Sequence, residues 1–335
     1  MSVATPEPVV TELTAAPELP PLEELLGRRS DARRSPTTAT FTLRDLLVLT
    51  YAVPAEAVRP HVPESIALDM LPSVEGERMA FIQTTCAYHE NARWSMLPEK
   101  AGGQSFHQIT YRVLTRREGR RGAFALRTYV SSDEGRLAQR GISRDADFAR
   151  FDIYIAGDPA RATYDGYKLR AQGDVGRTQI DARALPTLNP MPFPFGSMGE
   201  LASFLVDRPD NYFRASFPKT GIGVVTQDYG PLIAPFPPVA LELTEAPRLT
   251  LWTGLDLLPA NDPPKPYAAL VFPSVTVTSH PPRFAKFKKD APTPQPLPDR
   301  DDVIHQPLDP PTLTPPSDRK NFIQLPPPGQ EPCDA

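Results

Sequence analysis

The chain has 335 residues, 43 prolines, two cysteines and a formal net charge of −4 at pH 7. Acidic and basic residues are interspersed, which disfavours a nucleic-acid partner. Two cysteines cannot supply a disulfide framework, and this is typical of a reducing compartment. No run approaches the ~18 apolar residues of a membrane span, and the N-terminus lacks the apolar core of a secretory signal. The expected location is therefore the cytoplasm, with no membrane partner.

Proline content divides the chain into three segments. Residues 1–37 hold one predicted short helix, Pro21–Arg29, in an otherwise flexible segment. Residues 288–335 contain 13 of the prolines and few apolar side chains. Because proline lacks a backbone donor and little apolar surface is available for burial, this stretch is predicted to be a disordered tail. Residues 38–287 are long enough for one β-rich domain.

Within that domain, strand-like runs follow one another in chain order. Ala55–Val62 is expected to form a short helix or a turn, and Met198–Leu205 has the clearest helical spacing. Consecutive strands joined by short turns pair antiparallel, because parallel pairing needs long crossovers. The predicted fold class is therefore mainly β (α+β), with a few short helices. The predicted strands are Phe41–Val53, Ile66–Leu71, Met79–His89, Phe106–Thr115, Gly122–Ser131, Phe148–Ala156, Ala162–Gly173, Thr178–Ala184, Ile222–Tyr229, Val239–Leu243, Leu249–Trp252 and Ala268–Thr278.

Five arginines surround a predicted hairpin turn at Glu118-Gly119. Such a charge run at a turn is expected to be a solvated hairpin tip rather than a binding surface. The five are Arg112, Arg116, Arg117, Arg120 and Arg121.

Four segments in collinear order resemble the acetoacetate decarboxylase-like superfamily. They are TLRDLLVLTYAVPAEAVRPHVPESIALDML, FALRTYVSSD, YDGYKLRAQG and FLVDRPDNYFR. The second and fourth are most similar to a branch of unknown function within that superfamily. The resemblance spans about 240 residues and implies an antiparallel, barrel-like β fold with a buried pocket, in a protein that forms homo-oligomers.

The same resemblance implies a lysine that forms a Schiff base with a keto substrate, and this chain lacks it. The matching region, Asp133–Phe151, contains no lysine, and neither does the wider span Ala101–Tyr167. Arginine cannot replace lysine there, because it stays protonated and is not a nucleophile at neutral pH. Schiff-base decarboxylation by this route is therefore not expected.

The candidate site residues are three acid–base groups and three cations. The resemblance places Arg44 and Glu99 in the pocket, against the substrate carboxylate and the reacting region. His107 is a candidate general base because its ordinary pKa is near neutrality. The remaining candidates are Tyr129 as a catalytic group and Arg127 and Arg144 as anion-binding groups. Each also has an ordinary structural interpretation, as a surface ion pair, a solvated loop residue or a core residue.

No cofactor or metal is expected. The sequence has no HExxH, no paired CxxC and no glycine-rich phosphate loop, and its five histidines are scattered. The predicted function is a pocket protein acting on a small anionic metabolite, such as a keto acid, by non-covalent acid–base chemistry. Two alternatives stay open: a non-catalytic small-molecule binding protein, and an interaction protein that works through its proline-rich tail.

Overall fold

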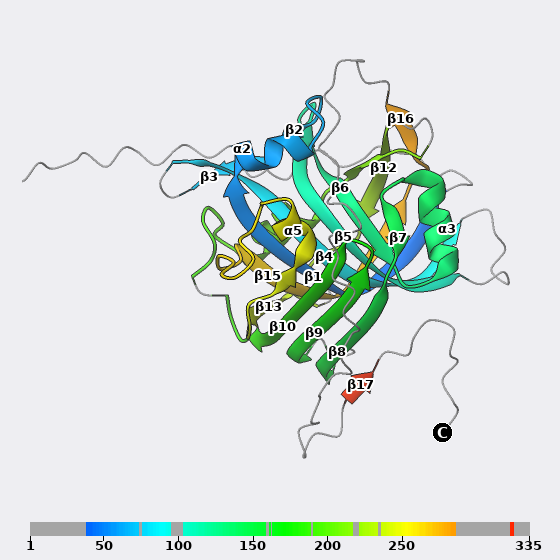
Figure 1. The fold of residues 1–335 in the computed structure, drawn as a ribbon. Coiled ribbons are helices and arrows are strands. Elements are labelled where there is room, and N and C mark those ends of the chain that lie inside the picture. Colours follow the sequence, from blue (N-terminus) through cyan, green and yellow to red (C-terminus); the bar gives the residue numbers. More distant parts are fainter. Residues whose placement is uncertain are drawn as a thin grey trace, which may run out of the picture.

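The computed structural model describes residues 38–73, 76–94, 103–158, 161, 163–188, 190–216, 221–233, 236–285 and 322–324. Most of the elements are strands (Figure 1). In chain order they are β1 (Ala39–Pro54), α2 (Ala55–Val58), η1 (Arg59–His61), β2 (Ala67–Leu68), β3 (Met70–Pro72), β4 (Arg78–Trp94), β5 (Gln104–Arg117), β6 (Arg120–Val130), α3 (Asp133–Ile142), β7 (Ala146–Phe148), β8 (Arg150–Asp158), β9 (Thr163–Gly173), β10 (Gly176–Leu185), α4 (Met198–Val206), β11 (Asp210–Arg214), β12 (Ile222–Tyr229), β13 (Val239–Leu243), β14 (Arg248–Leu249), α5 (Thr250–Gly254), β15 (Ala268–Ser279), β16 (Arg283–Ala285) and β17 (Phe322–Gln324).

Strand β1 is central, and it is paired along its length by β4 on one side and β15 on the other. Its apolar residues are buried on both faces, which explains its near-continuous apolar sequence. The two polar exceptions, Arg44 and Asp45, lie at a register shift between Arg44 and Leu47, where Asp45 has a φ of 51°. This bulge lets the apolar alternation resume on the same faces beyond it.

Seven strands close into a ring through their pairings: β1–β4, β4–β5, β5–β6, β6–β11, β11–β12, β12–β15 and β15–β1. Helix α4 packs into this ring through a cluster that includes Leu201, Phe204 and Leu205. A second layer, β13–β10–β9–β8, continues from β15 and curls around the other face of β4 and β5. The space between is filled by Tyr111, Trp252 and their neighbours. The sheet as a whole is not one closed barrel.

The mainly β prediction is confirmed, and most strand pairs are antiparallel. Two pairs are parallel, however: β6 with β7 and β6 with β11. The connection from β6 to β7 contains helix α3, and the longer connection from β6 to β11 also contains helix α4. Each connection is thus long enough to be the crossover that parallel pairing requires.

The predicted hairpin is also confirmed. Glu118 and Gly119 both have positive φ, 52° and 77°, as a tight two-residue hairpin turn requires.

Two elements differ from the sequence predictions. Leu249–Trp252, predicted as a strand, contributes one strand residue and then enters helix α5. A short apolar run does not distinguish a strand from a buried helix by periodicity. Helix α3 was not predicted, although Ser132 accepts a hydrogen bond from the Gly135 amide at 3.0 Å and caps its start.

The terminal predictions fall almost entirely outside the described residues, including the helix at Pro21–Arg29 and the proline-rich tail. One part of the tail, β17, pairs antiparallel with β8 at Tyr154–Ala156. The domain boundaries at residues 38 and 287 therefore stay predictions. Within the part of the chain that the structure describes, no helix is long and apolar enough to cross a membrane.

Candidate functional site

The arginine-rich hairpin is not a solvated tip, and that interpretation is wrong for most of its members. Arg112 is 8% exposed and Arg121 is 0% exposed. Arg116 and Arg120 form ion pairs with Asp69 and Asp210, at 3.4 and 3.1 Å. Only Arg117 pairs with the exposed Glu118 at the turn itself. The hairpin instead directs its cations inward, toward the C-terminal end of α4.

Asp69 is the carboxylate at the centre of this buried group. Arg208 bonds it directly, and Arg121 and Arg116 approach within 3.4 Å. Burial alone would raise the pKa of Asp69, but the three arginines outweigh burial and hold the pKa below its ordinary value. Arg121 also donates to the Phe204 carbonyl at 3.0 Å. Its charge therefore lies at the negative end of the α4 dipole.

Arg112 lies at the base of a separate cavity inside the seven-stranded ring. The cavity has a volume of about 250 Å³ and is lined by residues of β1, β4, β5, β6, α3, α4, β11, β12 and β15. Phe106, Gln108, Thr110 and Arg112 alternate along β5 and line its wall together. We call this cavity the Arg112 pocket.

The partners of Arg112 are all neutral. Its Nε donates to Gln83 Oε1 at 2.9 Å, and a terminal nitrogen lies 3.5 Å from the Leu205 carbonyl. The Tyr229 hydroxyl is its third partner. No carboxylate of the described residues forms an ion pair with Arg112. Burial lowers the pKa of Arg112, and Tyr229 opposes part of that effect. Arg112 is thus a buried cation without a counter-charge among the described residues, an arrangement that is costly unless an anion joins it.

Amides and hydroxyls surround the rest of the Arg112 pocket. Gln139 Nε2 donates to Gln108 Oε1 at 3.3 Å, and Gln108 Nε2 donates to Thr110 Oγ1 at 3.2 Å. On the facing strands, the Tyr229 hydroxyl and Asn211 Nδ2 both donate to Gln227 Oε1, at 2.8 and 3.0 Å. These groups can accept from or donate to a small polar ligand, as the few convergent polar groups of a ligand pocket do.

One wall of the pocket is aromatic. The His89 ring lies between Phe41 and Phe106, with centroid distances of 5.0 and 4.9 Å and interplanar angles of 27° and 11°. Burial, and secondly His107, lower the pKa of His89 to about 3. The imidazole is therefore neutral at pH 7, and it packs as a flat ring rather than as a cation.

The predicted residues Arg44 and His107 lie on the opposite face of the same sheet. Both are cross-strand neighbours of Tyr88. Arg44 is exposed and pairs with Glu90 at 2.7 Å, whereas His107 is buried with its ring 4.9 Å from Tyr88 and 6.0 Å from Phe151. The Nδ1 atom of His107 is buried without a hydrogen-bond partner. The structure thus places these two residues near each other, but away from the Arg112 pocket.

The other predicted residues are divided between interior and surface. Tyr129 and Arg127 both bond Asp174, and the Tyr129 hydroxyl donates to Oδ1 at 2.7 Å. Asp174 thus links Arg127 and Tyr129 inside the protein, although the Arg127 Nε is buried without a hydrogen-bond partner. Arg144 is exposed, and Glu99 lies outside the described residues. The functional roles predicted for all six residues stay predictions.

We expect the buried histidines to weaken the fold in acid. Burial lowers the pKa of His107 to about 4, whereas an unfolded histidine titrates near pH 6.5. Between these values the unfolded state binds more protons, so the free energy of unfolding falls as the pH drops through this window. The slope is up to about 1.4 kcal/mol per pH unit, and the full contribution is present above pH ~6.5. Urea unfolding from pH 7 to 4.5 should show a flatter slope for His107→Phe than for the wild type. Equal slopes would contradict this assignment.

Sequence reasoning missed the Arg112 pocket, although a signal for it was present. Gln108, Thr110 and Arg112 are polar at every second position of a predicted strand, which indicates one polar face. The pocket's other polar members come from β11 and β12, whose closeness to β5 follows from the ring closure.

Among the described residues, no three His, Cys, Asp or Glu side chains are grouped so as to hold a metal ion.

Residues 40–226 match the model of the DUF2071 family, described as an uncharacterized conserved protein. This match confirms the predicted branch of unknown function. No curated protein matches the chain.

Several solved structures are similar to the chain at low sequence identity. One is an acetoacetate decarboxylase from Legionella pneumophila subsp. pneumophila str. Philadelphia 1, with 12% identity, a TM-score of 0.46, and coverage of 84% of this chain and 96% of that one. Another is an acetoacetate decarboxylase-like enzyme from Sphingomonas wittichii RW1, at 10% identity, a TM-score of 0.45, and 77% and 98% coverage. A third is the enduracididine biosynthesis enzyme MppR complexed with pyruvate, at 15% identity, a TM-score of 0.45, and 76% and 92% coverage.

Proposed function

We propose that this chain, which belongs to the DUF2071 family of uncharacterized conserved proteins, binds a small carboxylate, such as a keto acid, in the Arg112 pocket. The observation that carries this proposal is a buried guanidinium whose partners among the described residues are all neutral, at a cavity of about 250 Å³. A ligand carboxylate would supply the missing counter-charge, and guanidinium geometry suits a carboxylate.

The size and lining of the pocket favour a compact ligand. Its volume lies just below the ~300–1,000 Å³ range of pockets for drug-sized molecules, which suits a short acid. The ligand's second polar group, such as a keto oxygen, would find donors and acceptors on Gln108, Gln139 and Tyr229. A flat body would pack against the aromatic wall formed by Phe41, His89 and Phe106.

The binding is non-covalent. The lining contains no lysine, and its His89 imidazole has its pKa lowered to about 3. Burial also raises the pKa of Tyr229, although Arg112 opposes the rise. The titratable groups of the lining that have resolved shifts are thus far from the near-neutral pKa that efficient general acid–base catalysis needs. The geometry therefore supports binding more directly than turnover, and acid–base roles for Glu99, His107 and Tyr129 remain proposals.

Calorimetric titration with matched ligands tests this function. Pyruvate should bind and pyruvamide should not, because only the acid carries a negative charge that can pair with the Arg112 guanidinium. Arg112→Gln should weaken pyruvate binding by roughly 10- to 100-fold, the value of a hydrogen bond to a charged group. Arg44→Gln is the matched control, because Arg44 is exposed and outside the pocket.

A second variant keeps the test decisive if Arg112→Gln unfolds the protein. Tyr229→Phe removes one neutral partner of Arg112 and one hydroxyl of the lining, and should weaken pyruvate binding severalfold. Equal affinity for the acid and the amide in the wild type would overturn the proposal. So would an unchanged Kd in a folded Arg112→Gln protein.

A further inference from the structure

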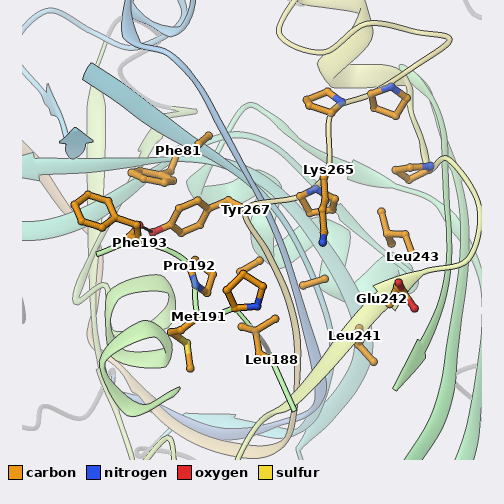
Figure 2. A pocket seen from close by; sticks show the side chains of 18 of the residues that line it. Phe81, Leu188, Met191, Pro192, Phe193, Leu241, Glu242, Leu243, Lys265 and Tyr267 are labelled. Carbon is orange, nitrogen blue, oxygen red and sulfur yellow. Dashed lines mark hydrogen bonds between the residues drawn. The ribbon is translucent and has the colours of Figure 1, made fainter. Parts of the chain in front are cut away.

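A second and larger cavity lies on the other side of α4. Its volume is about 1010 Å³, and it is bounded by the start of β4, the end of β13, Leu188, Pro190–Phe193 and the segment before β15 (Figure 2). Phe81 separates it from α4, with its ring 5.3 Å from Phe204. We call it the Lys265 cavity, after the cation that points into it. This site is independent of the proposed Arg112 pocket.

The walls of the Lys265 cavity are apolar. Phe81 and Tyr267 pack edge to face at 5.0 Å and form its aromatic side. The Tyr267 hydroxyl donates to the Phe193 carbonyl at 2.5 Å, which ties Phe193 to the segment that precedes β15. Leu188, Met191 and Leu241 face this aromatic side in the close-up view (Figure 2). A ligand here would bury a long or bulky apolar body.

The cavity also holds one unpaired cation. The Lys265 side chain extends into it from the rim (Figure 2), and its amine forms no ion pair or hydrogen bond with the described residues. Of the two acids in the lining, Glu242 is already bound by Arg183, at 2.5 and 2.8 Å. Glu245 and Lys265 are both exposed. Of the two charged side chains labelled in Figure 2, Glu242 has a partner and Lys265 has none among the described residues, so the charge that extends into the cavity and is available to a ligand is positive.

We infer that the Lys265 cavity binds an amphipathic carboxylate, with its apolar body along Phe81, Leu241 and Tyr267 and its carboxylate at the Lys265 amine. The volume lies at the upper end of the range for drug-sized ligands. It therefore admits a molecule much larger than a short keto acid. Apolar burial supplies most of the affinity, and the amine selects the charge of the head group.

Three probes with the same twelve-carbon chain test this assignment by calorimetry, each below its micelle concentration. Dodecanoate should bind about fivefold more tightly than dodecanol, the value of a partly exposed ion pair. Dodecyltrimethylammonium should bind most weakly. Lys265→Gln should lower dodecanoate affinity to that of dodecanol and leave dodecanol unchanged. Lys168→Gln, an exposed strand lysine paired with Asp181, is the matched control and should change nothing.

A wall variant tests the apolar half of the inference. Leu188→Asp should weaken the binding of all three probes, because it places a charged side chain in the apolar wall of the Lys265 cavity. Arg112→Gln should leave dodecanoate binding unchanged. The loss of ligand binding in the Arg112 pocket can then be distinguished from the loss of ligand binding in the Lys265 cavity. Equal affinity for the three probes, or tightest binding of the cation, would overturn the inference. Binding seen only after deletion of residues 288–335 would overturn it too, because it would assign the cavity to the chain's own tail.

Discussion

Asp69→Asn is expected to lower the free energy of unfolding by about 3–5 kcal/mol, the cost of leaving buried charges uncompensated. Asp69 is the one carboxylate that contacts Arg116, Arg121 and Arg208 in the described structure. Asparagine fills the same space but carries no charge, so the two fully buried arginines would lose their counter-ion. The Phe204 ring, which lies under both guanidinium groups at 4.5 and 4.7 Å, compensates only in part.

Urea unfolding at pH 7 measures this effect, with Glu90→Gln as the control. Glu90 pairs with Arg44 at the surface, and its loss should cost at most about 1 kcal/mol. The lowered pKa of Asp69 adds a pH signature. Its stabilisation is present above the unfolded aspartate pKa near 3.9 and is lost as the pH falls toward the folded pKa. The asparagine variant should lack this acid-induced component. A loss no greater than that of Glu90→Gln would contradict the central role given to Asp69.

Trp252→Ala is expected to cost about 3–5 kcal/mol, the range for removing a buried aromatic side chain. Trp252 is the largest fully buried side chain, and helix α5 inserts it between the two β layers. It packs edge to face with Tyr111 at 5.6 Å, and its Nε1 donates to Thr84 Oγ1 at 2.8 Å. Alanine would leave a large cavity next to the Tyr111 hydroxyl, which bonds Thr178 on β10.

Trp252→Phe separates packing from hydrogen bonding. Phenylalanine retains most of the ring volume but leaves Thr84 without its donor, so it should cost less than alanine. Thermal and urea unfolding of both variants, with Trp94→Phe as a fluorescence control, measure the difference. Equal losses for Ala and Phe would show that the indole hydrogen bond, rather than the packing, dominates at this position.

The strands and the main hairpin were predictable because they depend on local sequence. The apolar run of β1 and its end at Pro54 reflect burial on both faces and the missing proline donor. The Glu118-Gly119 turn needs two positive φ values, and Gly119 adopts one without steric cost. Helix α4 was read from its apolar spacing. Helix α5 was not, because five residues are too few to show a helical period.

The sequence by itself therefore determined a mainly β domain, with no lysine between Ala101 and Tyr167. Only the tertiary structure decided where the charges go. From the sequence, Arg112 and Arg121 belong to a charged run at a turn, which predicts solvent exposure. The sequence does not show that α4 and Asp69 contact this hairpin in the folded protein. The Arg112 pocket likewise combines β5 with β11 and β12 across the ring. Burial and charge pairing depend on contacts between distant segments, and these contacts bury Arg121 beside Asp69 and place Arg112 in the lining of a cavity.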